Sequence, residues 1–221
     1  MSTEFALLRG LEPEERRRVL ASCVPRRFKR REILCHEGDP GDCLHLVKSG
    51  LLLIRVATPL GHTATLTMIG PGDSFGELAL LGPDAIRTAT VEAAQNAETL
   101  TLSRARFEML RGANPGIDRM LTATLVEQVK RLSATVLEAL YLPVETRVVR
   151  RLDNLGRIYG AQTPIAEIRL TQEDLASMAG TTRVTANRVL RDLEQRGIVA
   201  LRRGRIIVID RAKLAAAAAI P

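Results

Sequence analysis

Short apolar segments separated by turn residues occupy much of the first half of the chain, between residues 33 and 102. The turns are rich in glycine, proline and aspartate, as in GDPG at 38–41 and GPGD at 70–73. Segments of this kind predict strands. The predicted strands are Ile33–Leu34, Leu44–Val47, Leu51–Val56, Ala64–Ile69, Thr88–Val91 and Thr99–Leu102. Their regular spacing predicts an antiparallel barrel or jelly roll, whose interior can enclose one small ligand.

Helical periodicity precedes these strands and replaces them after the last one. Leu7–Leu20 predicts an amphipathic helix, and Arg104–Arg111 predicts another directly after the strands. A long helix is predicted from Pro115 to about Tyr141, because proline suits a first helical turn and Pro143 restrains the residue before it.

The long helix carries a heptad seam of mainly apolar residues. The seam is formed by Leu121, Leu125, Gln128, Leu132, Thr135, Ala139 and Leu142, with Val129, Val136 and Leu140 beside it. Such a seam favours pairing of the helix with its copy in a homodimer, although a single helix lying on its own domain has a similar pattern. The helix 115–141 is therefore the predicted dimer contact, and Pro143 the predicted hinge or domain boundary.

Beyond Pro143 the pattern predicts two helices joined by a tight turn, after a further amphipathic helix at Val144–Ile158. Thr171 to Asp174 has the Thr-x-x-Asp form of a helix start, and this helix runs to about Met178. A turn containing glycine follows, and Thr182 can cap a second helix that reaches about Arg196. This is the layout of a helix-turn-helix.

The second of these helices has two distinct faces. Its core face is formed by Ala186, Val189, Leu190 and Leu193, and its other face by Arg183, Val184, Asn187, Arg188 and Arg191. The second face can enter a DNA major groove, where arginine binds guanine bidentately. A predicted hairpin, Ile198–Leu201 and Ile206–Ile209, surrounds the basic stretch 202–205 and forms a wing able to contact phosphates.

Charge supports a nucleic-acid partner for the C-terminal third. The chain of 221 residues has a net charge of +7; residues 1–142 hold 18 Lys and Arg against 17 Asp and Glu, and residues 143–221 hold 14 against 8. A basic domain attached to a neutral one is expected of a DNA-binding protein, although a solvated basic surface gives the same count. No apolar run reaches the ~20 residues of a membrane span, and no signal-peptide pattern begins the chain, so we expect a cytoplasmic protein without a membrane partner.

Cysteine and histidine usage excludes several other classes. Cys23, Cys35 and Cys43 lack paired spacing, which argues against a disulfide framework or a zinc site. The three histidines lack metal-ligand spacing, so no metal is assigned. No Ser/His/Asp set or P-loop is present, and no stretch is left for a catalytic domain, so we expect no enzyme activity.

Phe75–Val91, with the sequence FGELALLGPDAIRTATV, is the candidate ligand site. Gly76 permits close approach, and a short helix at Glu77–Leu81 would direct its first N–H groups towards an anion. Arg87 and Thr88 add a guanidinium and a hydroxyl. A phosphate ester is the ligand that this combination suits, while a helical turn with a surface ion pair is the plain alternative.

These features in this order resemble one protein family. The strand-rich region with GELALL and RTA, the long helix and LTQEDLASMAGTTRVTANRVLRDLE are similar to the Crp/Fnr superfamily of bacterial transcription regulators, in its cyclic-nucleotide-responsive, catabolite-activator-like branch. The resemblance runs from about Leu8 to Ile209. It implies an α+β chain with an N-terminal β-roll (jelly roll) sensor domain at 1–112, a dimerisation helix at 113–142 and a C-terminal winged helix-turn-helix domain at 143–221. It also implies a homodimer, a two-fold-symmetric DNA site and contact with RNA polymerase.

The resemblance assigns an effector site. Glu77 would bind the ribose 2′-hydroxyl of a cyclic nucleotide, and Arg87 the cyclic phosphate, helped by Thr88 and by the backbone of Gly76, Leu78 and Ala79. Relatives that bind cAMP place adjacent Thr and Ser against the adenine, where this chain has Leu132 and Ser133. Thr88 beside Arg87 resembles domains that accept cGMP. The implied effector is therefore cAMP, with cGMP as the alternative.

The resemblance also assigns a DNA-binding surface. Its members are Thr171, Thr182, Arg183, Val184, Asn187, Arg188, Arg191, Arg203 and Arg205. Arg183 and Arg188 match the family's base-reading arginines, but Val184 stands where a glutamate that reads cytosine is usual. We expect the half-site to keep its guanines and to differ at the intervening base pair.

One alternative within the family stays open at this point. The β-roll could be a scaffold in a regulator that needs no small ligand, or that responds to oxidation through Cys23, Cys35 or Cys43.

Overall fold

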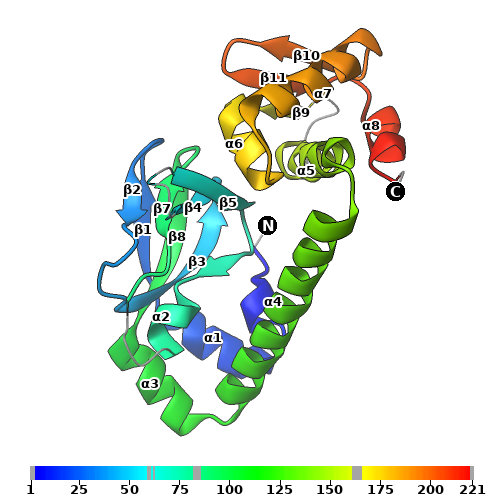
Figure 1. Ribbon diagram of the computed structural model, residues 1–221. Helices are drawn as coiled ribbons and strands as arrows, with labels where there is room; N and C mark the ends of the chain where they lie inside the picture. The colour runs from blue at the N-terminus through cyan, green and yellow to red at the C-terminus, as the bar shows by residue number, and fades with distance from the viewer. Residues whose placement is uncertain (1–2, 59–60, 62, 82–85, 161–165, 220–221) are drawn as a thin grey trace. The chain divides into compact units, whose positions relative to one another are not determined.

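Two compact units, Met1–Arg131 and Leu132–Pro221, make up the protein. The computed structural model describes residues 3–58, 61, 63–81, 86–160 and 166–219 (Figure 1). Within these residues, no helix combines the length and apolar character that crossing a membrane requires.

The first unit contains two four-stranded antiparallel sheets, in the orders β1-β8-β3-β6 and β2-β7-β4-β5. The strands are β1 Val24–Phe28, β2 Ile33–Cys35, β3 Cys43–Ser49, β4 Leu52–Ala57, β5 Thr63–Ile69, β6 Ser74–Phe75, β7 Thr90–Ala93 and β8 Ala97–Ser103. Val47 and Phe75 from one sheet pack with Leu52 and Val91 from the other in a buried cluster. Because each strand alternates inward and outward side chains, this cluster fills the space between the sheets. The predicted β-roll is confirmed.

A second core joins the helices of this unit to the roll. These helices are η1 Ala6–Leu8, α1 Pro13–Ala21, α2 Glu77–Leu81, α3 Arg104–Ala113 and the first turns of α4 Gly116–Tyr141. Their buried residues include Leu8, Phe107 and Ile117, which cluster with Leu44 and Leu102 of the roll. The core thus fixes the base of the long helix to the β-roll (Figure 1).

The N-terminal helix predicted at Leu7–Leu20 is present, but its predicted start is wrong. The structure has a short 3₁₀ turn and then α1, which begins at Pro13. Proline has no N–H and cannot continue a preceding helix, but it suits the first position of a new one. The side chain of Glu15 accepts a hydrogen bond from the backbone N–H of Glu12 at 2.9 Å, which satisfies a free donor at this new start.

Strands β1 and β6 have no counterpart in the sequence prediction. Four of the five residues of β1 are exposed, so the apolar alternation that marks a strand is absent. The backbone ladder with β8 holds β1 at the edge of its sheet, where Pro25 is tolerated. Strand β7 also begins later than predicted, at Thr90 instead of Thr88, and β8 begins earlier, at Ala97 instead of Thr99.

The second unit is a winged helix-turn-helix, as predicted. Its elements are α5 Val144–Tyr159, β9 Ala166–Ile168, α6 Gln172–Met178, α7 Arg183–Gln195, β10 Val199–Arg202, β11 Arg205–Val208 and α8 Arg211–Ala218. The hairpin β10-β11 gains a third strand, β9, which the sequence does not signal. The predicted cap at Thr171 is confirmed, since its hydroxyl accepts a hydrogen bond from the N–H of Asp174 at 3.0 Å.

Candidate functional site

The guanidinium of Arg87 is buried in the wall of the β-roll, with the side chain only 5% exposed. Backbone hydrogen bonds of 2.8 Å from Arg87 N to Asp39 O and from Gly38 N to Arg87 O fix its position. Its Nη2 donates to Cys43 Sγ at 3.2 Å and lies 3.8 Å from Asp42 Oδ1. Among the described residues, Nε and Nη1 have no hydrogen-bond partner. A buried cation with free N–H groups is costly and attracts an anion.

Gly76 allows this guanidinium to lie against the backbone. A Cβ at this position would overlap both Arg87 Nη1 and the carbonyl oxygen of Cys43. The φ angle of Gly76 is +93°, which side chains rarely adopt. Glycine is therefore required here by space as well as by backbone conformation.

Glu77 begins α2 on the same side of the roll and also has a buried, unpaired atom. Its Oε2 has no hydrogen-bond partner among the described residues. Burial raises the pKa of Glu77, and the nearby charges of Arg131 and Arg87 partly oppose that rise. Arg104 fixes α2 to the roll, because its Nη1 donates to Leu80 O at 3.1 Å and its Nη2 to Gly41 O at 3.2 Å.

Behind Arg87 lies a layer that sequence reasoning missed. His45 stacks on Phe75 with ring centroids 4.5 Å apart, and its Nε2 lies 3.4 Å from Cys43 Sγ. Its Nδ1 lies 3.1 Å from Thr99 Oγ1. Burial, reinforced by the positive charge of Arg87, lowers the pKa of His45 to about 3, so the ring is neutral at physiological pH. Cys43 and His45 share one face of β3, but antiparallel strand pairing alone brings Phe75 and Thr99 to His45, so no spacing in the sequence could reveal those contacts.

The other predicted effector residues lie in different surroundings. Leu78 and Thr88 are exposed in the first unit, whereas Leu132 and Ser133 are exposed on α4 within the second unit. The side chain of Ala79, and residues 82–85 of the predicted cassette, lie outside the described residues.

The three cysteines are free thiols in the structure. Burial raises the pKa of Cys23 and of Cys43 to about 11, and also raises that of Cys35. Within the residues that the structure describes, no group of three or more His, Cys, Asp or Glu side chains could hold a metal ion.

Helix α7 presents the two faces that its sequence predicts. Its core residues Ala186, Val189, Leu190 and Leu193 are all buried. On the other face, Arg183, Arg188 and Arg191 are exposed, and Val184 is 80% exposed. Asn187 is half-buried and donates to Gln172 Oε1 of α6 at 2.8 Å.

Two arginines of this outer face are held by carboxylates. Nη2 of Arg188 lies 2.6 Å from Oε1 of Glu145 in the first turn of α5, and Arg191 pairs with Glu194 at 3.0 Å. The Arg188–Glu145 pair is exposed at both partners, and such pairs contribute only ~0–1 kcal/mol. Arg188 can therefore exchange Glu145 for another anion at little cost. In the second pair Arg191 is exposed, whereas Glu194 is half-buried and also accepts a hydrogen bond from Leu201 N at 2.9 Å.

The start of α7 and the wing complete the basic surface. The hydroxyl of Thr182 caps α7 by accepting from Thr185 N at 3.3 Å. In the wing, Arg203 and Arg205 are exposed, and Nη1 of Arg205 lies 3.0 Å from Glu167 Oε1.

Exposed apolar side chains lie on α4 in and beside the predicted seam. Val129 is 62% exposed and Leu140 is 70% exposed, and Leu132, Val136 and Leu137 are exposed as well. A contiguous row of this kind on a long helix is typical of an interaction surface. The first seam residue, Leu121, is instead buried in the core of the first unit, and Leu125 is half-buried.

Comparison with known proteins identifies both units. Residues 25–114 match the cyclic nucleotide-binding domain, and residues 146–217 match the Crp-like helix-turn-helix domain. A sensor domain of this kind joined to a helix-turn-helix defines the class: the protein is a transcription regulator, and its matching domains and relatives are not enzymes.

Several relatives match along nearly the whole chain. The CRP-like cAMP-activated global transcriptional regulator of Mycobacterium tuberculosis is 29% identical over 213 residues, covering 95% of this chain and 94% of the relative. The cyclic AMP receptor protein of Thermus thermophilus is 31% identical over 208 residues, covering 94% of each. The crystal structure of Thermus thermophilus catabolite activator protein matches with a TM-score of 0.56 at 29% identity, covering 96% of this chain and 98% of that one. The chain belongs to the Crp/Fnr family.

We predict that Glu77→Gln stabilises the ligand-free protein at neutral pH by about 1 kcal/mol, because it removes a buried carboxylate with an unpaired oxygen. The raised pKa means that ionising Glu77 lowers stability as pH rises from its ordinary value of 4.5 through the folded value. The stability gained by Glu77→Gln should therefore be full above the pKa that Glu77 has in the folded protein, and it should be absent well below pH 4.5. Urea unfolding across this pH range measures it.

The matched control for this measurement is Glu98→Gln. The Glu98 carboxylate binds Lys48 at 2.8 Å, and that bond lowers its pKa, so its loss should not stabilise the protein. A Glu77→Gln protein that is no more stable than the wild type at neutral pH would contradict the prediction.

Proposed function

We propose that this protein is a homodimeric, DNA-binding transcription regulator whose affinity for DNA is controlled by a cyclic nucleotide, with cAMP as the first candidate and cGMP as the second. The observation that carries the proposal is the pair of buried groups with unpaired atoms, Arg87 and Glu77, on one side of the β-roll. Together they offer free N–H donors and a free carboxylate oxygen.

The chemistry of this pair suits the two polar halves of a cyclic nucleotide. Nε and Nη1 of Arg87 would donate to the cyclic phosphate, with the backbone of residues 76–79 and the hydroxyl of Thr88 as further donors. The carboxylate of Glu77 would accept a hydrogen bond from the ribose 2′-hydroxyl. Binding would therefore satisfy buried groups that the described residues leave unpaired.

The identity of the base depends on other residues. Leu132 and Ser133 of α4 would contact the base, and Leu132 can make only apolar contacts. Thr88 offers a hydroxyl that suits a guanine as well as a phosphate. These residues keep cGMP as an alternative to cAMP, which the printed names of the relatives favour.

Control of DNA binding requires the effector to distinguish two states. A nucleotide can shift the recognition helix only if it binds the DNA-competent state more tightly than the other state. Paired α4 helices within the domain 113–142 would connect the sensor domain 1–112 to the DNA-binding domain 143–221.

DNA recognition is assigned to α7 and the wing. Arg183 and Arg188 would read guanines in the major groove, and Val184 would contact the base pair between them without accepting a hydrogen bond. Thr171, Thr182, Asn187 and Arg191 would position the helix, and Arg203 and Arg205 would contact phosphates. We further propose a two-fold-symmetric site, a cytoplasmic location and contact with RNA polymerase.

Oxidant sensing by Cys23, Cys35 or Cys43 is the less favoured alternative. Burial raises the pKa of all three thiols, so little reactive thiolate exists at neutral pH.

We expect Arg87→Ala to weaken nucleotide binding at least ~30-fold, because a buried charge-assisted pair is lost. Calorimetric titration of the wild type and the variant with cAMP and then with cGMP measures the effect and identifies the base. The variant should keep its fold and its oligomeric state. Unchanged nucleotide affinity would remove Arg87 from the site.

We expect Val129→Asp to convert the dimer to monomers, because it places a charge in the apolar row of α4. Val129 is exposed in the single chain, so the fold of the monomer should be unaffected. Sedimentation velocity measures the oligomeric state, and a wild-type protein that sediments as a monomer would refute the proposed dimer.

We expect Arg188→Ala and Arg203→Ala to weaken DNA binding in different ways. Loss of a guanine contact should cost ~1–3 kcal/mol and relax sequence preference at one position. Loss of a phosphate contact from the wing should weaken binding to all sequences and reduce the salt dependence. Binding-site selection followed by salt titration separates the two, and equal loss of preference in both variants would contradict these roles.

A further inference from the structure

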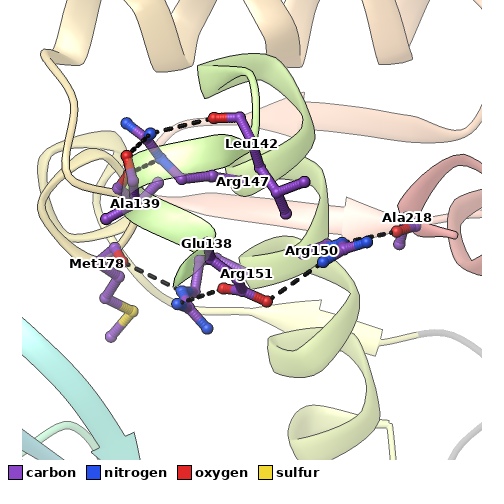
Figure 2. A network of polar contacts seen from close by, with 9 residues as sticks. Glu138, Ala139, Leu142, Arg147, Arg150, Arg151, Met178 and Ala218 are labelled. Atoms are coloured by element: carbon purple, nitrogen blue, oxygen red, sulfur yellow. Dashed lines mark hydrogen bonds and ion pairs between the residues drawn. The ribbon is translucent and has the colours of Figure 1, made fainter. Parts of the chain in front are cut away.

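Three arginines on one face of α5 hold together the C-terminal ends of three other helices. Arg147, Arg150 and Arg151 stand at positions i, i+3 and i+4 and therefore project from the same side. Their guanidinium groups bond to the end of α4, to the turn that follows α6 and to the end of α8 (Figure 2). We call this set, with Glu138, the arginine clamp.

Arg147 connects the end of α4 directly to the turn of the helix-turn-helix. Its Nη1 donates to Ala139 O at 3.0 Å and to Leu142 O at 3.2 Å. Its Nε donates to Ala179 O at 3.0 Å and its Nη2 to Gly180 O at 3.2 Å. One side chain thus bonds to four carbonyls from two segments.

Glu138 is the anion of the clamp. Its Oε2 accepts from Arg151 Nη2 at 2.8 Å, and its Oε1 lies 3.4 Å from Arg150 Nη1. The same two arginines also donate to carbonyls, Arg151 to Met178 O at 3.2 Å and Arg150 to Ala218 O at 3.0 Å. Figure 2 shows the Glu138 carboxylate lying between the two guanidinium groups.

The physical basis of the clamp is complementary charge. Carbonyls at a helix C-terminus carry partial negative charge and lack partners within the helix, so arginines satisfy and stabilise them. The Glu138 side chain is only 25% exposed, and its pairs are therefore less screened than the exposed Arg188–Glu145 pair.

The last turns of α4 depend on these polar bonds for their attachment within the single chain. From residue 135 to residue 142, only Glu138 and Leu142 are partly buried, and the other side chains are exposed. Apolar packing therefore contributes little there. The polar bonds cross Pro143, where a bend would have to break them.

We propose that Glu138 is a positioning residue that makes residues 138–142 and the helix-turn-helix move as one body. A displacement of α4 near Ser133 then reaches the recognition helix through the clamp instead of being absorbed by bending at Pro143. This inference rests on the proposed control of DNA binding by a nucleotide.

The test compares Glu138→Gln with the matched control Glu127→Gln. Both glutamates lie on α4 and both substitutions remove one negative charge, but among the described residues Glu127 pairs only with Lys130, at 2.8 Å, on the exposed surface. Two quantities are measured in each full-length protein: hydrogen exchange of the backbone amides of residues 139–142, and the ratio of DNA affinities with and without cAMP.

We expect Glu138→Gln to accelerate exchange in 139–142 and to reduce the affinity ratio about fivefold, while cAMP affinity in the absence of DNA stays unchanged. Glu127→Gln should change neither quantity. Glu138→Asp retains the charge and should recover part of the ratio. Thermal unfolding confirms that each variant is folded.

Faster exchange with an unchanged ratio would overturn the positioning role, and so would a reduced ratio with unchanged exchange. If wild-type DNA affinity does not respond to cAMP, the proposed nucleotide control fails. The exchange measurement still tests whether Glu138 holds the end of α4 to the helix-turn-helix. Unchanged exchange in Glu138→Gln would overturn that role whether or not the protein responds to cAMP.

Discussion

The burial of one guanidinium, that of Arg87, is the constraint on which the sensor unit depends. Strand pairing and the bonds between Asp39, Gly38 and Arg87 hold the residue in the roll wall. Gly76 removes the side chain that would occupy its place. The neutral His45 behind it adds no second positive charge. A protein that leaves N–H groups of a buried cation unpaired loses stability, which is accepted where a ligand binds.

The two units differ in how the guanidinium groups of their buried and half-buried arginines are paired. In the β-roll, Nε and Nη1 of Arg87 and Oε2 of Glu77 have no hydrogen-bond partner among the described residues. In the arginine clamp, each of the three arginines bonds to backbone carbonyls, and Glu138 balances two of them. Guanidinium groups with unpaired N–H donors suit a ligand-binding site, whereas fully paired guanidinium groups suit a rigid connection between helices. The β-roll and the arginine clamp thus use the same residue type with different pairing.

The outer face of α7 follows a third arrangement. Arg188 pairs with Glu145 in an ion pair that is exposed to water, and the exposed Arg191 pairs with the half-buried Glu194. The exposed pair is weak and screened by salt, so another anion can replace its carboxylate. The inner face of the same helix is packed and buried. The packed core residues and the arginines therefore lie on different faces of one helix.

Local patterns in the sequence determined most of the elements, the two faces of α7 and the Thr171 cap, because each depends on spacing between neighbouring residues. The sequence motif also marked Gly76, Glu77 and Arg87. Tertiary structure alone decided the exposed edge strand β1, whose ladder with β8 replaces an apolar pattern. It also decided that Arg87 meets Cys43 and that Glu138 meets Arg150 and Arg151. These contacts join residues from different elements, and their partners are fixed by strand register and helix packing, which no local spacing encodes.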